Sequence, residues 1–343
     1  MSHAAVSIEI CASVGGMVLK TMNNFQDQFT TLKKSIKTLQ TLTIPLAIVG
    51  ILLCVGAVML GDPEQTYKAL VTLMFISGIA AIIGAVAVWA VAKNKEWKLK
   101  QLVSDNVTVG VLKDAFELHE YSPQRAVPHD LVYNSRLISG WSDYSGSDLV
   151  RGKYKGQNFM FSDIDLTETV TTTDTEGNST TTTYECFKGQ WIILEPAENK
   201  TKISGELRLR SKGKSGGGFF GSLKNTRSVK VTKLPKSTIE TESIAFNKQF
   251  QIEAKDGHET FLILTPLFME QITEAETASG GKLFVYFSGR QIHIAIYNSR
   301  NLLEHCSRNK AHREIDSLRE YQANEVKYIT GIMDIFLQND KLF

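Results

Sequence analysis

The residues with the most suggestive chemistry form a glycine-rich stretch inside a basic segment. Residues 215–221 read SGGGFFG, which matches the GxGxxG spacing of loops that hold phosphate through backbone N–H groups. A dinucleotide site needs an apolar strand before the glycines, whereas the preceding residues, LRLRSKGKS, are charged. A protein kinase also needs HRD and DFG motifs, which the chain lacks. We therefore do not expect phosphate-transfer chemistry here.

Other reactive side chains form only weak combinations. His305 and Cys306 lie near His312, but this spacing alone does not define a thiol–imidazole pair, and a solvated face is the preferred interpretation. His258 and Glu259 are not followed by a second histidine at zinc-protease spacing. His293 alternates with isoleucines on an expected strand, and we predict that it packs on the solvent face of that strand.

Composition points away from several functional classes. The chain of 343 residues has 38 Lys and Arg against 36 Asp and Glu, a net charge of +2, so it is not a globally basic nucleic-acid binder, and nucleic acid is not an expected partner. Its four cysteines are scattered, without a CxxC pair, which predicts neither a disulfide framework nor a zinc site. We expect no enzyme activity, no catalytic residues, no metal and no cofactor.

Two uncharged apolar stretches lie in the N-terminal third, at residues 43–60 and 69–92. As helices they would be roughly 27 and 36 Å long, against a membrane hydrocarbon core of about 30 Å. The link between them has only eight residues, so the helices must run antiparallel. We predict a transmembrane hairpin over 43–92, in preference to two core helices of a soluble protein.

The distribution of lysine predicts the orientation of this hairpin. Three lysines precede the first span and four follow the second, whereas the link has one; in order they are Lys33, Lys34, Lys37, Lys93, Lys95, Lys98, Lys100 and Lys68. Cytoplasmic flanks of membrane helices carry the excess of Lys and Arg. Both termini are therefore predicted to lie in the cytoplasm.

Helices are expected on both sides of the spans, as a stalk. Residues 1–42 carry a coiled-coil-like 4-3-4-3 seam, which consists of Val18, Met22, Phe25, Phe29, Leu32, Ile36 and Leu39. A weaker apolar stripe follows the spans on a juxtamembrane helix over 93–122. The seam either packs on that second helix within one chain or pairs with a second copy and builds a homo-oligomer, and the sequence leaves both interpretations open.

Residues 123–343 show an α+β pattern. We predict a short helix over 128–138, strands over 148–154 and 158–164, a polar hairpin around residues 174–178 and a strand over 190–194. Low-complexity disorder is the alternative for the threonine-rich hairpin. Strands are predicted over 250–254, 260–264, 282–287 and 291–297, with a helix from Thr265 to Gly280 and a long C-terminal helix over 311–338.

The segment 207–236 is read as a basic Gly/Phe insert in this domain. It has nine cations and no acidic residue, and the simplest interpretation is a flexible linker. The functional interpretation is contact with anionic lipid, at about 1 kcal/mol per cation near the surface. The residues expected to make that contact are Arg208, Arg210, Lys212, Lys214, Phe219, Phe220, Lys224 and Arg227.

Several stretches resemble a known bacterial membrane-protein family. They are SGWSDYSGSDLVRGKYKGQNFMFSDIDL (139–166), LILTPLFMEQI (262–272) and IHIAIY (292–297). In this order they are similar to the family catalogued as domain of unknown function 3137, over roughly residues 95–340. The resemblance implies two spans before a cytoplasmic domain in the bacterial plasma (inner) membrane. The basic insert is richer here than in the family pattern, and the family has no established activity, so no functional residue is transferred.

Together these patterns predict a membrane-anchored interaction or scaffold protein. Its expected partners are the lipid bilayer, a protein of unknown identity and a second copy of the chain. An interaction module should show a flat or grooved apolar patch. Two alternatives stay open: an unrecognised enzyme should have a deep pocket with convergent polar side chains, and an oligomeric membrane-perturbing assembly should place polar residues along its spans.

Overall fold

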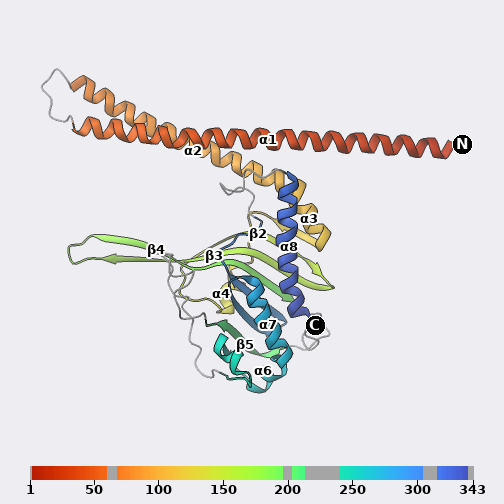
Figure 1. Ribbon diagram of the computed structural model, residues 1–343. Coiled ribbons are helices and arrows are strands. Elements are labelled where there is room, and N and C mark those ends of the chain that lie inside the picture. Colours follow the sequence, from red (N-terminus) through yellow and green to blue (C-terminus); the bar gives the residue numbers. More distant parts are fainter. Residues whose placement is uncertain (1, 60–67, 196–202, 213–238, 304–314, 339–343) are drawn as a thin grey trace. The chain divides into compact units, whose positions relative to one another are not determined.

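The computed structural model describes residues 2–59, 68–195, 203–212, 239–303 and 315–338 (Figure 1). It confirms the expected mixture of two apolar N-terminal helices, a sheet domain and a C-terminal helix. The chain divides into two compact units. The first comprises residues 1–108 and 305–318, and the second comprises residues 109–304 and 319–343.

The first unit is built from two long helices. α1 spans Ser2–Met59, with Pro45 inside it, and α2 spans Lys68–Val103. A short π-helix, η2 (Ser104–Thr108), continues α2. Both α1 and α2 are long and apolar enough to cross a membrane.

Small residues form the contact between α1 and α2. Gly50 and Ala57 of α1 are buried, as are Gly78, Ala85 and Ala92 of α2. Their spacing of seven keeps them on one side of each helix. A Cβ atom added at Gly78 would lie 2.6 Å from Cys54 Sγ and 3.0 Å from the carbonyl oxygen of Gly50. The two backbones therefore approach closely, as small residues allow in membrane helices.

The second unit contains an antiparallel sheet in the order β1-β2-β3-β4-β8-β7-β5-β6. The strands are β1 (Glu117–Ser122), β2 (Asp143–Tyr154), β3 (Gln157–Thr173), β4 (Ser179–Glu195), β5 (Ile203–Ser211), β6 (Phe250–Ala254), β7 (Lys282–Gly289) and β8 (Gln291–Tyr297). The predicted threonine hairpin is the β3–β4 turn, and the predicted final hairpin is β7–β8.

Helices cover one face of the sheet and an irregular segment covers the other. Apolar side chains of α3 (Val109–Ala115), α5 (Ile244–Gln249), α6 (Gly257–Ile263), α7 (Pro266–Ser279) and α8 (Ile315–Leu337) pack with those of the strands in one core cluster. A second cluster lies on the opposite face, under residues 127–141 and the short helix α4 (His129–Ser135).

Three sequence expectations need correction. The juxtamembrane helix does not run to 122, because Glu117–Ser122 pairs with Leu149–Lys153 as strand β1. The segment 260–264 is not a strand, because Asp256 accepts a hydrogen bond from the His258 N–H and starts α6 there. Strand β5 occupies the beginning of the segment that was read as a flexible insert.

Helix α7 is confirmed in its predicted form. Thr265 accepts a hydrogen bond from the Phe268 N–H at 3.3 Å, and Pro266 opens the helix. Gly280 ends it with a φ of 62°, in the left-handed region that glycine tolerates. Both ends of α7 are therefore defined by capping residues, so the helix presents a regular face to its neighbours.

Candidate functional site

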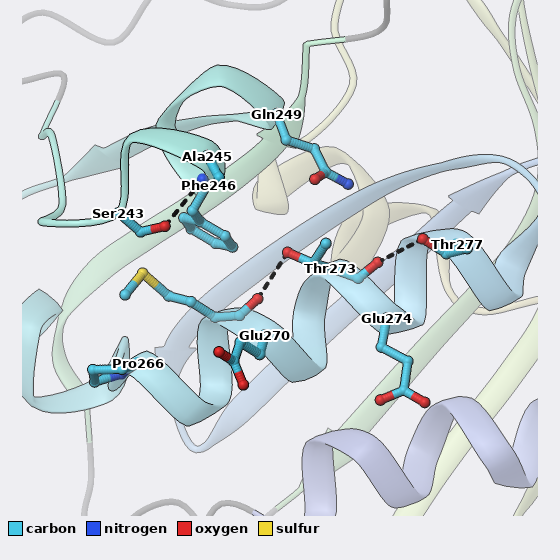
Figure 2. A pocket seen from close by; sticks show the side chains of 10 residues that line it. Ser243, Ala245, Phe246, Gln249, Pro266, Glu270, Thr273, Glu274 and Thr277 are labelled. Carbon is cyan, nitrogen blue, oxygen red and sulfur yellow. Dashed lines mark hydrogen bonds between the residues drawn. The ribbon is translucent and has the colours of Figure 1, made fainter.

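A groove of about 520 Å³ lies between α5 and α7 in the second unit (Figure 2). α5 contributes Ala245, Phe246 and Gln249, with Ser243 just before it. α7 contributes the side chains of one face, which are Pro266, Met269, Glu270, Thr273, Glu274 and Thr277. The site therefore depends on two short elements that both pack on the same face of the sheet.

The floor of the groove is apolar. Phe246 and Met269 belong to the core below it. The Thr273 hydroxyl donates to the Met269 carbonyl at 2.9 Å, and the Thr277 hydroxyl donates to the Thr273 carbonyl at 3.0 Å. These donors are used within their own helix (Figure 2). The groove is thus suited to apolar side chains more than to a small polar substrate.

Apolar side chains also stand exposed beside the groove. Ile244 of α5 is 71% exposed and Leu267 of α7 is 64% exposed. Phe261 and Leu262 of α6, which do not line the groove, are about half exposed, at 49% and 47%. Exposed apolar groups gathered around a groove are typical of protein-binding surfaces.

Charge at the groove is negative. Glu270 and Glu274 are exposed and lie four residues apart on α7, where like charges repel each other by a few tenths of a kcal/mol. Neither carboxylate forms an ion pair with another residue in the described ranges. The nearest cation on α5 is Lys248. The pair of carboxylates therefore offers a place for the cations of a partner.

The opposite face of the sheet carries a second group of charged residues, which is closed to solvent. Arg208 and Arg210 of β5 are each 1% exposed. The Arg208 Nε donates to the Ser135 carbonyl at 2.8 Å, and the Arg210 Nη2 donates to the Arg136 carbonyl at 2.9 Å. These bonds satisfy carbonyls at the C-terminal end of α4, where cations are favoured. Both guanidinium groups hold α4 on the sheet.

The remaining contacts of these arginines confirm a structural role. Arg210 Nη1 lies 2.6 Å from Glu253 Oε2, an ion pair that does not have hydrogen-bond angles. Burial lowers the pKa of Arg210, and Glu253 opposes this change. The Arg208 guanidinium lies 4.4 Å from the ring centroid of Tyr286. A charge enclosed in this way is not available to a ligand from outside.

His293 belongs to the same closed face. It is 2% exposed, so the prediction that it packs on the solvent face is wrong. The Trp191 indole N–H lies 3.3 Å from His293 Nδ1 and donates to it. Burial lowers the pKa of His293 to about 4, which keeps the imidazole neutral. The alternation of His293 with isoleucines suggested one buried and one exposed face, but both faces of β8 are buried, and the His293 side chain packs with the second cluster.

The residues predicted to contact lipid are divided by the structure. Arg208 and Arg210 cannot reach headgroups, because they are buried on β5 between the sheet and the end of α4. Lys212 is exposed and its Nζ donates to the Asn247 carbonyl at 2.6 Å. Lys214, Phe219, Phe220, Lys224 and Arg227 lie outside the described residues.

The predicted seam of α1 packs within the chain where its side chains are described. Phe29 and Ile36 are each 6% exposed, in a cluster with Leu99, Val103, Val107 and Leu318. Phe25 and Leu32 pack against that cluster, and Leu39 is half-buried. The side chains of Val18 and Met22 lie outside the described residues. These contacts favour the intramolecular interpretation, and pairing with a second copy stays a prediction.

Among the described residues, Asp163 has a structural role. Asp163 accepts from the Gln190 amide at 3.2 Å and from the Leu302 N–H at 2.8 Å, so it anchors a loop. His305, Cys306 and His312 lie outside the described residues. Within the described ranges, no group of three or more His, Cys, Asp or Glu side chains is placed to hold a metal ion.

Residues 185–337 match the family model described as "Protein of unknown function (DUF3137)". Over these residues the chain is similar to the DUF3137 family. The match confirms the sequence resemblance over these residues. No curated protein matches the chain, and no solved structure matches it either.

The DUF3137 segment contains both regions described above. It includes β5 to β8, α5, α6 and α7, and therefore the whole groove and the two buried arginines. The helices α1 and α2 and the strands β1 to β3 precede it.

Sequence reasoning missed the groove. The sequence pattern predicts no helix over 244–249, so α7 has no predicted neighbour at the position of α5. The residues that carry the signal are apolar side chains that stay exposed on these helices, Ile244, Phe261, Leu262 and Leu267.

Proposed function

We propose that this protein is a membrane-anchored interaction module, in which the groove between α5 and α7 binds a basic amphipathic helix of a protein partner. The observation that carries the proposal is the exposure of Ile244 and Leu267 beside a groove with two uncompensated carboxylates. Helix-in-groove recognition uses apolar anchors on one helix face. Lys or Arg side chains flanking those anchors would meet Glu270 and Glu274.

Membrane anchoring is supported by the outer surfaces of α1 and α2. Leu52, Val58, Leu73 and Ile83 are each more than 60% exposed. In water such a surface would be an aggregation hazard, whereas in lipid it is the expected one. We extend the proposal to a bacterial inner membrane with both termini in the cytoplasm, as the lysine distribution favours.

The proposed role is binding rather than catalysis. The groove is mainly apolar, and its two carboxylates stand on an exposed helix face without a histidine or cysteine beside them in the lining. Perturbed and converging titratable groups are the usual sign of a catalytic centre. An interaction role explains the apolar surface directly.

The test uses the full chain in nanodiscs of zwitterionic lipid and an 18-residue synthetic helix with leucine on one face and lysine beside it. We expect hydrogen-exchange protection of residues 243–249 and 266–279 when the peptide is added. Glu270→Lys with Glu274→Lys should weaken binding about tenfold, because attraction becomes repulsion at two positions. Empty nanodiscs correct for binding of the peptide to lipid.

The matched control reverses two exposed carboxylates away from the groove, Asp114→Lys with Glu117→Lys. This variant should bind like the parent. Equal weakening by both double variants, or equal protection by a scrambled peptide of the same composition, would contradict the proposal.

A further inference from the structure

The β3–β4 hairpin extends beyond the sheet as a two-stranded ribbon (Figure 1). Its pairing continues to Thr173 opposite Ser179. The neighbouring strands end earlier, because β2 reaches only Thr167 and β8 reaches only Gly189. Residues 170–183, which we call the ribbon, therefore have no ladder partner on their outer edges within the described part of the chain.

The ribbon is built as a regular strand pair. Threonine hydroxyls face each other across it, at 3.4 Å for Thr169 and Thr183 and at 3.1 Å for Thr171 and Thr181. The Asp174 carboxylate accepts hydrogen bonds from the N–H groups of Glu176 and Asn178, which closes the turn. A regular pair leaves alternate backbone N–H and C=O groups pointing outward along both edges.

The ribbon lacks the usual protection of an open edge. Natural sheets block free edges with lysine, proline, bulges or a covering element. Residues 170–183 contain neither lysine nor proline, and the only irregularity in the β3–β4 pairing lies before them, between Leu166 and Thr167. The β-branched threonines also favour extended partners.

Charge selects the kind of strand that can pair with this edge. The ribbon contains two carboxylates, Asp174 and Glu176, and no Lys or Arg. Glu168 and Glu185 lie at its base, where Glu185 accepts hydrogen bonds from the Tyr297 and Ser299 hydroxyls. Hydrogen bonds from Asn178 lower the pKa of Asp174, so the turn stays negatively charged. Like charges on adjacent strands are destabilising, which disfavours pairing with the ribbon of a second copy. A basic strand is complementary.

We propose that the ribbon binds an extended, basic polypeptide segment, which adds to one of its edges as a third strand. Backbone hydrogen bonds supply the affinity in this mode, and side chains supply the selectivity. This site is separate from the groove between α5 and α7, and it calls for a strand where the groove calls for a helix.

The test uses the full chain in nanodiscs of zwitterionic lipid and a nine-residue peptide in which lysine alternates with valine and threonine. We expect saturable binding, with new hydrogen-exchange protection of amides in residues 170–183. Glu168→Lys with Glu176→Lys should weaken binding at least tenfold. Glu176→Lys alone, at an exposed carboxylate of the turn, should leave the hairpin intact and weaken binding severalfold. Asp114→Lys with Glu117→Lys is again the matched control.

Two further peptides decide between mechanisms. The same peptide with every backbone amide methylated keeps its charge but loses its N–H donors along both edges, and we expect it not to bind. The analogue with glutamate in place of lysine should not bind either. Binding of either peptide at the parent affinity, or protection confined to residues 243–279, would overturn the proposal. The Glu270→Lys and Glu274→Lys variant should bind the strand peptide normally, which separates this result from the test of the groove.

Discussion

The two units of this protein place their apolar residues in opposite ways. In the pair of α1 and α2, the contact is made by Gly50, Gly78 and Ala85, whereas leucine and isoleucine face outward. In the sheet unit, the large side chains are inside, and Trp191, Phe287 and their neighbours have no exposed surface. One arrangement suits a surrounding of lipid and the other a surrounding of water.

The difference shows what holds each unit together. Burial of large apolar groups stabilises the sheet unit, at about 25 cal/mol for each Å² removed from water. The helix pair gains little from this effect if its surroundings are as apolar as its interior, and close contact of small residues replaces it. Removal of a large apolar side chain should therefore change the free energy of unfolding by different amounts in the two units.

The largest expected effect contrasts a phenylalanine of the sheet with a leucine of the helices. Phe287→Ala removes a fully buried ring that packs on Phe268, with ring centroids 6.3 Å apart, and should lower the free energy of unfolding by about 3 to 5 kcal/mol. Leu52→Ala removes a side chain that is 64% exposed and should change it by less than about 0.5 kcal/mol. Denaturant titrations of the full chain in nanodiscs, followed by tryptophan fluorescence, measure both.

Phe287→Leu serves as the milder variant if the alanine protein does not fold. It should lose stability by an intermediate amount, because most of the buried volume is kept. A larger loss of stability for Leu52→Ala than for the Phe287 variants would contradict the inference that burial of large side chains stabilises the sheet unit more than the helix pair.

The second prediction concerns charge in the interior of the sheet unit. Burial lowers the pKa of His293 to about 4, whereas an exposed histidine titrates near 6.5. Between these values the unfolded chain binds a proton that the folded chain does not bind. The stability that neutral His293 provides is therefore complete above about pH 6.5 and decreases as the pH falls to 4, by about 3 kcal/mol in total.

Denaturant titrations at pH 7, 6 and 5 test this effect. Other groups also titrate in this range, so the parent is compared with His293→Gln, which cannot take up the proton. The parent should lose more stability per pH unit than the variant. Parallel pH profiles would show that His293 is accessible to protons in the folded state.

The smallest expected effect tests the contact of α1 with α2. A Cβ atom at Gly78 would meet Cys54 Sγ at 2.6 Å, whereas a Cβ atom at Gly84 would meet only Leu46 Cδ2, at 3.5 Å. Gly78→Ala should therefore destabilise the helix pair by about 1 to 3 kcal/mol. Gly84→Ala should be neutral or stabilising by up to about 1 kcal/mol, because alanine favours helices. Loss of helicity in a detergent titration measures both, and equal effects would contradict the close contact.

Local signals made much of the fold predictable from the sequence. Thr265, Pro266 and Gly280 define both ends of α7, and the alternation around residues 250–254 and 282–297 defines three strands. The apolar stretches 43–60 and 69–92 fall within α1 and α2, apart from residue 60, which lies outside the described ranges. Each of these features depends on neighbours in the chain, so a single sequence is sufficient to find it.

The candidate site depended on contacts that the sequence does not display. The alternation LRLRS lies in the basic segment 207–236, for which the sequence favours a flexible linker. The carbonyls of residues 135–137, more than seventy positions earlier, satisfy those guanidinium groups. The groove likewise requires α5 and α7 to lie together, and neither helix contains a signal for the other.

The position of β8 in the sheet has a consequence for the synthesis of the protein. β8 lies between β4 and β7, and it is the last strand to be translated. Until residue 297 has been translated, β1–β4 and β5–β7 lack the strand that joins them in the described sheet. A nascent chain at that stage is prone to wrong pairing. Completion of one seven-residue strand is therefore required before the two halves of the described sheet can be joined.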